Sequence, residues 1–439
     1  MRGRKLARPD ELPDSVPETP DGHLAHVLLQ QISTDLVVVC DDIETHTGIS
    51  HARTRRSASP PQDWSSPVTT GTPTSNPEAR CYLRHMDGGF EGQVARIVEG
   101  FYPRSHQVEI VDFGPIPGGF SRETFRFDAI VHAAGGQQRH QLILRKDPPP
   151  AVALLETSRA IEHDLIEAVR LNTTVPVTQS LGYEMDRSVL GEAAMVLRRA
   201  DGNSMTTDLF HDGPDVDQVD DVVRHLCESL VELHQTDIAT LNPNGDLDDP
   251  RHVGIDVASW DRYMDSTFDY YLDHYSQINR DPMLCLLLDV FLTLRRTKPR
   301  PLPLSVVHGD FNPANFLYAD GRVTALIDWE NARVGDPRED LGWMAMMDGL
   351  SNTSIMSHPA DEGGFLAYYN TLTGYEITEQ EIGYFVLFGS ANIAVPINAA
   401  INRRVLLENR ELLHLYLIQS SAPALPGMAQ LLQYPGVPA

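Results

Sequence analysis

Apolar and polar residues alternate over the first stretch of this chain that reads as globular. Residues 108–131 follow a strand, Gly/Pro turn, strand pattern, in which Phe125, Phe127 and Ala129 alternate with polar neighbours. A third strand is predicted over residues 140–146, and three consecutive prolines from Pro148 to Pro150 end it. The pattern therefore predicts three consecutive strands.

A helix period replaces this alternation in most of the remaining chain. The first predicted helix spans about Ser158–Leu171 and places these apolar residues on one face: Ile161, Leu165, Ala168 and Val169. Short strands are predicted within residues 175–184 and 193–199, before Asp201 and Gly202. Further helices are predicted at Asp221–Asp237, Pro282–Arg296, 363–374 and 381–420. A β-rich part thus precedes a larger helical part, which indicates an α+β protein.

Composition divides the chain into four segments. Residues 1–80 are predicted to be an appendage that contains a disordered linker rich in Ser, Thr and Pro. The β-rich part is expected at 81–200, the helical part at 201–425 and a short tail at 426–439. A chain of 439 residues is too long for one compact core, so at least two units are expected.

Charge and cysteine content exclude several classes of protein. The formal net charge of −26, with no basic stripe, opposes binding to nucleic acid or to anionic membranes. The four cysteines are far apart and form no C-x-x-C pair, which fits a reducing cytoplasm. The N-terminus lacks the apolar core of a secretory signal, and residues 26–40 are too polar to cross a bilayer. Nothing in the sequence indicates an oligomeric state.

The densest chemistry lies between Val306 and Glu330. Two apolar strands end there in polar loops, and between them residues 316–323 have the pattern of a strand, an Asp-Gly hairpin turn and a strand. The hairpin would bring Asp310, Asn315 and Asp328 to one side. Two oxygen ligands and a separate carboxylate suit a magnesium nucleotide, because Mg²⁺ takes few protein ligands and completes its shell with phosphate and water. This set indicates phosphoryl transfer to a hydroxyl group.

Three ordered motifs resemble the aminoglycoside phosphotransferase-like superfamily, whose members share the protein-kinase fold and phosphorylate small molecules. The H-G-D-x-x-x-x-N motif is His308–Asn315, the D-W-E motif is Asp328–Glu330, and G-D-P-x-x-D-L is Gly335–Leu341. In the residues of these motifs the chain is most similar to the kinase-like domains found beside acyl-CoA dehydrogenases. The resemblance implies a bilobal fold with a small antiparallel sheet and one helix in the N-terminal lobe, and a helical C-terminal lobe.

The resemblance also implies roles for individual residues. Asp310 would be the catalytic base, and Asn315 and Asp328 would bind Mg²⁺. The helical lobe would bind a small-molecule hydroxyl acceptor, as in relatives that act on aminoglycosides, macrolides, choline, homoserine or hydroxyacyl thioesters. The sequence does not identify the acceptor.

The β-rich lobe would bind ATP or GTP. In the family's place for a phosphate-binding cation stands Arg145, not Lys146, and Asp164 aligns with the helix carboxylate that anchors this cation, with Glu162 and Glu167 as the other candidates. The remaining nucleotide contacts are expected from a glycine-rich loop and from the adenine hinge: Gly118, Gly119, Ser121, Arg198 and Ala200. Without the resemblance, a simple turn between two strands explains the two glycines better than phosphate binding does.

Other interpretations stay open at this point. A nucleotide-binding relative with weak or no catalysis would explain why the third strand lacks a strict Lys and the helix a strict Glu. A metal-dependent hydrolase is disfavoured, because only one histidine, His308, lies near the cluster. That histidine more simply supports the loop, and Asp336 and Asp340 cap a helix or hold backbone. The tryptophans Trp329 and Trp343 are expected to be core or cleft aromatics.

Overall fold

The structure is a computed structural model. It describes residues 89–116, 122–149, 157–204, 206–210, 216–278, 283–351, 353–392, 428 and 432. The predicted appendage at 1–80 and most of the predicted tail at 426–439 lie outside these residues.

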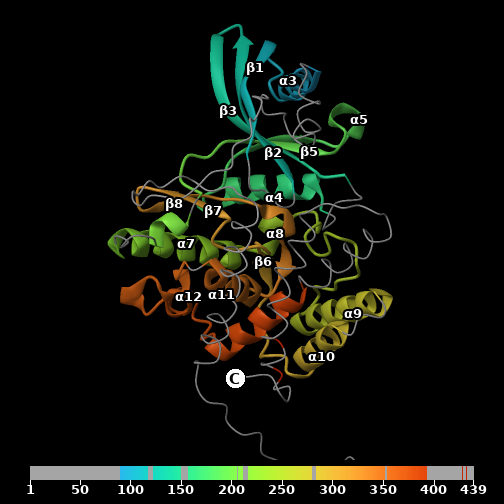
Figure 1. The fold of residues 1–439 in the computed structure, drawn as a ribbon, viewed down its shortest axis with the longest axis vertical. Helices are drawn as coiled ribbons and strands as arrows, with labels where there is room; N and C mark the ends of the chain where they lie inside the picture. The colour runs from blue at the N-terminus through green and yellow to red at the C-terminus, as the bar shows by residue number, and fades with distance from the viewer. Residues whose placement is uncertain are drawn as a thin grey trace, which may run out of the picture.

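One five-stranded antiparallel sheet forms the N-terminal lobe (Figure 1). Its strands follow the order β1-β2-β3-β5-β4, and each neighbouring pair is antiparallel. The strands are β1 (Ser105–Pro115), β2 (Glu123–Ala133), β3 (Gly136–Lys146), β4 (Ser180–Glu184) and β5 (Ala194–Arg198). Helix α3 (Gly89–Phe101) packs against β1, and their apolar side chains share one core with β2, β3 and β5.

Helix α4 (Arg159–Asn172) lies between this sheet and the helical lobe (Figure 1). Ser158 caps it by accepting a hydrogen bond from the backbone N–H of Ile161. Leu165, Ile166 and Val169 are buried in the main core of the C-terminal lobe, and β5 contributes Met195 and Leu197 to the same core from above. The two lobes therefore share one continuous apolar cluster.

Helices build the C-terminal lobe around two clusters. They are α6 (Thr207–Phe210), α7 (Val216–Gln235), α8 (Ile238–Leu241), α9 (Trp260–Ile278), α10 (Met283–Arg296), α11 (Arg338–Ser351) and α12 (Phe365–Thr373), with a further helical stretch at 379–392. Four short segments complete the elements: α5 (Arg187–Leu190) in the N-terminal lobe and the 3₁₀ turns η1 (Trp329–Asn331), η2 (Ile355–Ser357) and η3 (Ala360–Glu362). No helix in the described ranges has the length and apolar character needed to span a bilayer.

Two small sheets carry the motif residues. Strand β6 (Ser305–Val307) pairs with β9 (Arg333–Gly335), and β7 (Phe316–Ala319) pairs with β8 (Arg322–Leu326). The β7–β8 turn has positive φ at both central residues, 48° at Asp320 and 72° at Gly321. This is the backbone that a two-residue Asp-Gly hairpin requires, so the predicted hairpin is confirmed.

Three long helices were not predicted from the sequence, and one charged residue of β2 was placed on the wrong face. Helices α3, α9 and α11 were not predicted, because glycines interrupt α3 and α11, and tyrosines, which favour strands, are frequent in α9. Asp128 falls on the predicted polar face of β2 but is buried, because Arg139 on β3 covers it at 2.5 Å.

A buried arginine ties α11 to the 379–392 helix, and its loss should destabilise the protein strongly. The fully buried Arg338 pairs with Asp336 at 2.6 Å and with Glu381 at 2.8 Å. We expect Arg338→Met to lower the free energy of unfolding by about 3–5 kcal/mol, because Asp336 stays buried without its cation. Urea unfolding measures this.

The matched control is Arg295→Met. Arg295 pairs with Asp269 at 2.8 Å, but these side chains are 37% and 66% exposed. The expected change is below about 1 kcal/mol. Equal losses in the two variants would contradict the assigned burial.

Candidate active site

A loop that follows β6 carries the first motif, and buried groups hold its backbone. The carboxylate of Asp340 accepts hydrogen bonds from the N–H groups of His308 at 2.7 Å and Gly309 at 2.8 Å. Asp340 is itself held by the Nε2 of His234 at 3.1 Å. Gly309 has a φ of 78°, and a Cβ there would collide with the carbonyl oxygen of Asn331. Only glycine fits this turn.

His308 supports the loop and is not placed to act as a base. It is fully buried, its Nε2 contacts the carbonyl of Ile327 at 3.0 Å, and its Nδ1 accepts from the N–H of Asp310 at 3.3 Å. Burial lowers its pKa, which favours the neutral ring that this pair of contacts requires. Both ring nitrogens are therefore occupied.

The Asp310 side chain is fixed by three N–H donors. Asn315 donates from Nδ2 to Oδ2 at 2.9 Å, and Asn312 donates from Nδ2 to Oδ1 at 2.8 Å. The indole Nε1 of Trp343 also donates to Oδ1, at 2.7 Å. The predicted contact between Asp310 and Asn315 is therefore present, whereas the contacts of Asn312 and Trp343 were not predicted.

Electrostatics suit Asp310 to proton transfer near neutral pH. Burial, together with the negative charge of Asp328, raises the pKa of Asp310 to about 7, although the three N–H donors lower it. A general base is most effective when its pKa lies near the working pH. The backbone N–H of Ile327, directly before Asp328, donates to the carbonyl of Asn315 at 2.9 Å, which brings Asp328 near the Asn315–Asp310 pair.

Asn315 and Asp328 present oxygens that fit a magnesium ion. Both N–H groups of the Asn315 amide point at Asp310, to its Oδ2 and its backbone carbonyl, so the amide Oδ1 faces the other way. Asp328 sits at the end of β8 with a φ of 68° and remains 27% exposed. Among the described residues no cluster of three His, Cys, Asp or Glu could hold a metal. Two oxygens with phosphate and water are the donor set that Mg²⁺ takes.

Arg145 of β3 bridges the two lobes. It donates to Glu162 of α4 at 2.9 Å and to Asp328 at 2.6 Å. Burial opposes its charge, but Asp328 and Glu162 outweigh this effect and raise the pKa of Arg145. The neighbouring Lys146 lies apart from this pair and binds Glu123 at 2.6 Å.

The predicted anchor Asp164 is wrong, because Glu162 occupies this place. Asp164 is exposed on α4, whereas Glu162 is buried on the face toward Arg145. Glu167, the other candidate, is half-buried and binds Arg170 and the backbone N–H of Ser180. The apolar stripe of α4 identifies the side that packs on the C-terminal lobe, but it does not reveal a second buried side that is charged.

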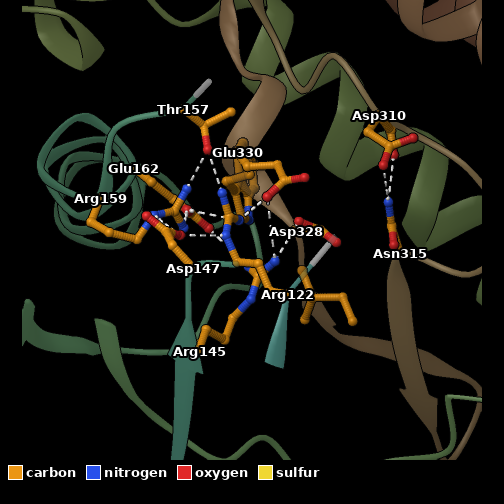
Figure 2. Close-up of polar contacts among 12 residues, drawn as sticks. Arg122, Arg145, Asp147, Thr157, Arg159, Glu162, Asp310, Asn315, Asp328 and Glu330 are labelled. Carbon is orange, nitrogen blue, oxygen red and sulfur yellow. Dashed lines mark hydrogen bonds and ion pairs between the residues drawn. The ribbon is translucent and has the colours of Figure 1, made fainter. Parts of the chain in front are cut away.

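Two further arginines extend this ion-pair network, and sequence reasoning missed both (Figure 2). Arg122, directly before β2, pairs with Glu330 of the D-W-E motif and with Asp147 at 2.9 Å. Arg159 of α4 pairs with Glu162, and its Nη2 donates to the hydroxyl of Thr157 at 2.9 Å. Figure 2 shows these side chains converging, with Asp310 and Asn315 as a separate pair.

Positive and negative charges nearly balance in this network. The guanidinium groups of Arg122, Arg145 and Arg159 face four carboxylates: Asp147, Glu162, Asp328 and Glu330. Burial and the neighbouring arginines lower the pKa of Arg122 to about 10, while Glu162 and Asp147 oppose this shift. Arg122 therefore stays charged at neutral pH.

The remaining nucleotide predictions are only partly located. Gly118, Gly119 and Ser121 lie outside the described residues. The N–H of Arg198 is bonded to the carbonyl of Gln179 at 2.9 Å, and its side chain binds Gln179 and His140. Because its backbone N–H is already bonded, Arg198 cannot use this group to donate a hydrogen bond to an adenine. Ala200, which follows β5, stays a prediction.

Comparisons with known proteins agree with the three motifs. The chain is 26% identical over 280 residues to "Probable acyl-CoA dehydrogenase IBR3" of Arabidopsis thaliana, a match that covers 61% of this chain and 31% of that relative. It is 22% identical over 351 residues to acyl-CoA dehydrogenase family member 11 of Gallus gallus, covering 76% of this chain and 41% of that relative. The chain thus spans less than half the length of these relatives.

The fold has a solved counterpart. The structure of a candidate aminoglycoside phosphotransferase from Ralstonia eutropha has a TM-score of 0.54 and 18% identity, and the match covers 77% of this chain and 96% of that one. The predicted bilobal protein-kinase-like fold is confirmed. The profile of the phosphotransferase enzyme family matches residues 112–376, more than half of the sequence. This chain therefore belongs to the phosphotransferase enzyme family.

Proposed function

We propose that this protein transfers the γ-phosphate of ATP or GTP to a hydroxyl group of a small molecule, with Mg²⁺ as cofactor. One observation carries the proposal: Asn315 holds the Asp310 carboxylate with an amide whose oxygen faces away from it, and its backbone carbonyl bonds the N–H of Ile327, directly before Asp328. A base and two metal ligands are the parts that phosphoryl transfer requires.

Each group has a defined task in this mechanism. Asp310 orients the acceptor hydroxyl and takes its proton, while Asn315 and Asp328 hold the metal. When bound, Mg²⁺ would neutralise negative charge on the phosphates of the nucleotide. Arg145, held by Glu162, contacts the α- and β-phosphates, for which a bidentate guanidinium is suited. Positioning and electrostatics supply most of the catalysis.

The acceptor is a small hydroxyl compound, and the matches to acyl-CoA dehydrogenase family members rank a metabolite above an antibiotic. Hydroxyacyl thioesters, choline, homoserine and aminoglycosides form the first panel to test. A nucleotide-binding module without catalysis is the second candidate, because Arg145 contacts the metal ligand Asp328. Mg²⁺-dependent nucleotide turnover with this panel separates the two.

The catalytic base is tested by Asp310→Asn. The amide cannot accept the proton of the acceptor hydroxyl, so we expect kcat to fall by at least about 1,000-fold, within the range for lost general-base catalysis. The affinity for Mg-ATP, measured by calorimetry, should change less than about threefold, because Asp310 does not bind the nucleotide. Full activity in this variant would exclude the proposed base.

The phosphate-binding cation is tested by comparing Arg145→Gln with Lys146→Gln. Removing the guanidinium should weaken Mg-ATP binding by about 10- to 100-fold, the effect of a lost charge-assisted hydrogen bond. Lys146 pairs with Glu123 away from the site, so its variant should bind nucleotide normally. A stronger effect at Lys146 would reverse the assignment.

The anchor of this cation is tested by Glu162→Gln and Asp164→Asn. Three arginines lie around Glu162, within 4 Å, so loss of its charge should lower the free energy of unfolding by about 3 kcal/mol and raise the KM for Mg-ATP. The exposed Asp164 should contribute less than about 0.5 kcal/mol. Urea unfolding and steady-state kinetics measure both. If only Asp164→Asn lowered the stability and raised the KM for Mg-ATP, Asp164 would be the anchor after all.

A further inference from the structure

The two oxygens of the Asp310 carboxylate differ in their remaining hydrogen-bonding capacity. Oδ1 accepts from the Nδ2 of Asn312 at 2.8 Å and from the Nε1 of Trp343 at 2.7 Å. Oδ2 accepts only from the Nδ2 of Asn315, at 2.9 Å, among the described residues. Because a carboxylate oxygen has two lone-pair sites, Oδ1 is fully used and Oδ2 keeps one site open.

We propose that Trp343 is a positioning residue that, together with Asn312, occupies Oδ1 of Asp310 and so makes Oδ2 the oxygen that receives the acceptor's proton. This inference rests on the proposed function and assigns the geometry of its proton transfer. Trp343 acts through Asp310 and needs no contact with the acceptor.

The transfer balances with these groups alone. The acceptor oxygen forms a bond to the γ-phosphorus as its O–H bond breaks and its proton moves to Oδ2. The bond from the γ-phosphorus to the bridging oxygen breaks, and the nucleoside diphosphate leaves with that electron pair. Asp310 then returns the proton to solvent.

Neighbouring packing holds both donors to Oδ1 in place. The Oδ1 of Asn312 accepts from the N–H of Ala314 at 2.8 Å, which fixes the direction of its amide. Trp343 lies on α11 against the 379–392 helix, where a Cβ on Gly389 would come 3.1 Å from the indole Cε3. A Cβ on Gly342 would come 2.7 Å from the backbone of Phe385. This close helix contact leaves little room for the indole to move.

An aromatic residue beside a catalytic carboxylate can also simply line the acceptor site. The two roles predict different kinetics. A lining residue would mainly change the KM for the acceptor, whereas a residue that orients Asp310 changes kcat with little effect on KM.

Trp343→Phe separates these roles, because it keeps an aromatic ring and removes only the N–H donor and part of the ring. We expect kcat to fall by about 10-fold or more, the effect of a lost hydrogen bond to a charged group, with less than threefold change in either KM. Gly389→Ala places a methyl group against the indole, so it should also lower kcat, but by less than Trp343→Phe does.

Trp260→Phe is the matched control. Its indole Nε1 also donates to a buried carboxylate, that of Asp336 at 2.5 Å, but it holds α9 to α11 and not Asp310. This variant should lose stability while kcat stays within twofold. An unchanged kcat in Trp343→Phe, or an equal fall in Trp260→Phe, would overturn the proposal and leave the proposed function intact.

A second measurement does not depend on turnover. In protein labelled with ¹⁵N at tryptophan, the signal missing from Trp343→Phe identifies its indole N–H. Asp310→Ala should shift this signal upfield and speed its exchange with water. An indole signal that does not respond to Asp310→Ala would overturn the proposal even if no acceptor is turned over. Failure of the proposed function would give a different result. The wild-type protein would show no turnover, but its Trp343 indole signal would still respond to Asp310→Ala.

Discussion

The fully buried carboxylate of Asp340 is the constraint on which the site depends. It accepts two consecutive backbone N–H groups, from His308 and Gly309, directly before Asp310. Burial raises the pKa of Asp340, but the hydrogen bonds that it accepts from His234 and from the backbone N–H of His308 outweigh this effect and lower it. The residue is thus an anion that fixes the direction of the loop leading to Asp310. Because Asp340 starts α11 and His234 ends α7, the loop is positioned by two long helices of the main core.

The lobes are joined by apolar contact and by charge, in two different places. Helix α4 and β5 bury apolar residues in the main core of the helical lobe. On the other side of α4, arginines from the N-terminal lobe reach Asp328 and Glu330, which follow β8. Buried ion pairs of this kind give geometric specificity more than stability, because desolvation offsets much of their attraction. They set how the sheet sits over Asp328 and Glu330.

The local parts of this site could be predicted from sequence, and the long-range parts could not. The Asp-Gly turn requires a hairpin backbone by itself, so the meeting of the β7 and β8 strands followed from a short segment. The anchor of Arg145 depends on how α4 rotates relative to the sheet. Its apolar residues define one buried side only, and Glu162 lies on another.

The same limit applies to Trp343 and Arg122. Trp343 stands fifteen residues after Asp328 in the chain, and only the packing of α11 brings its N–H to Asp310. Arg122 reaches Glu330 across the interface between the lobes. Apolar periodicity carries no information about which polar groups meet across such an interface.

The shared use of Asp328 has a consequence for the order in which ligands arrive. On the proposed function, this carboxylate is a partner of Arg145 in the free protein and a ligand of the metal in the loaded one. Free metal would have to displace a guanidinium, whereas nucleotide phosphates offer that guanidinium a replacement anion. Metal and nucleotide should therefore each strengthen the binding of the other, since such coupling is reciprocal.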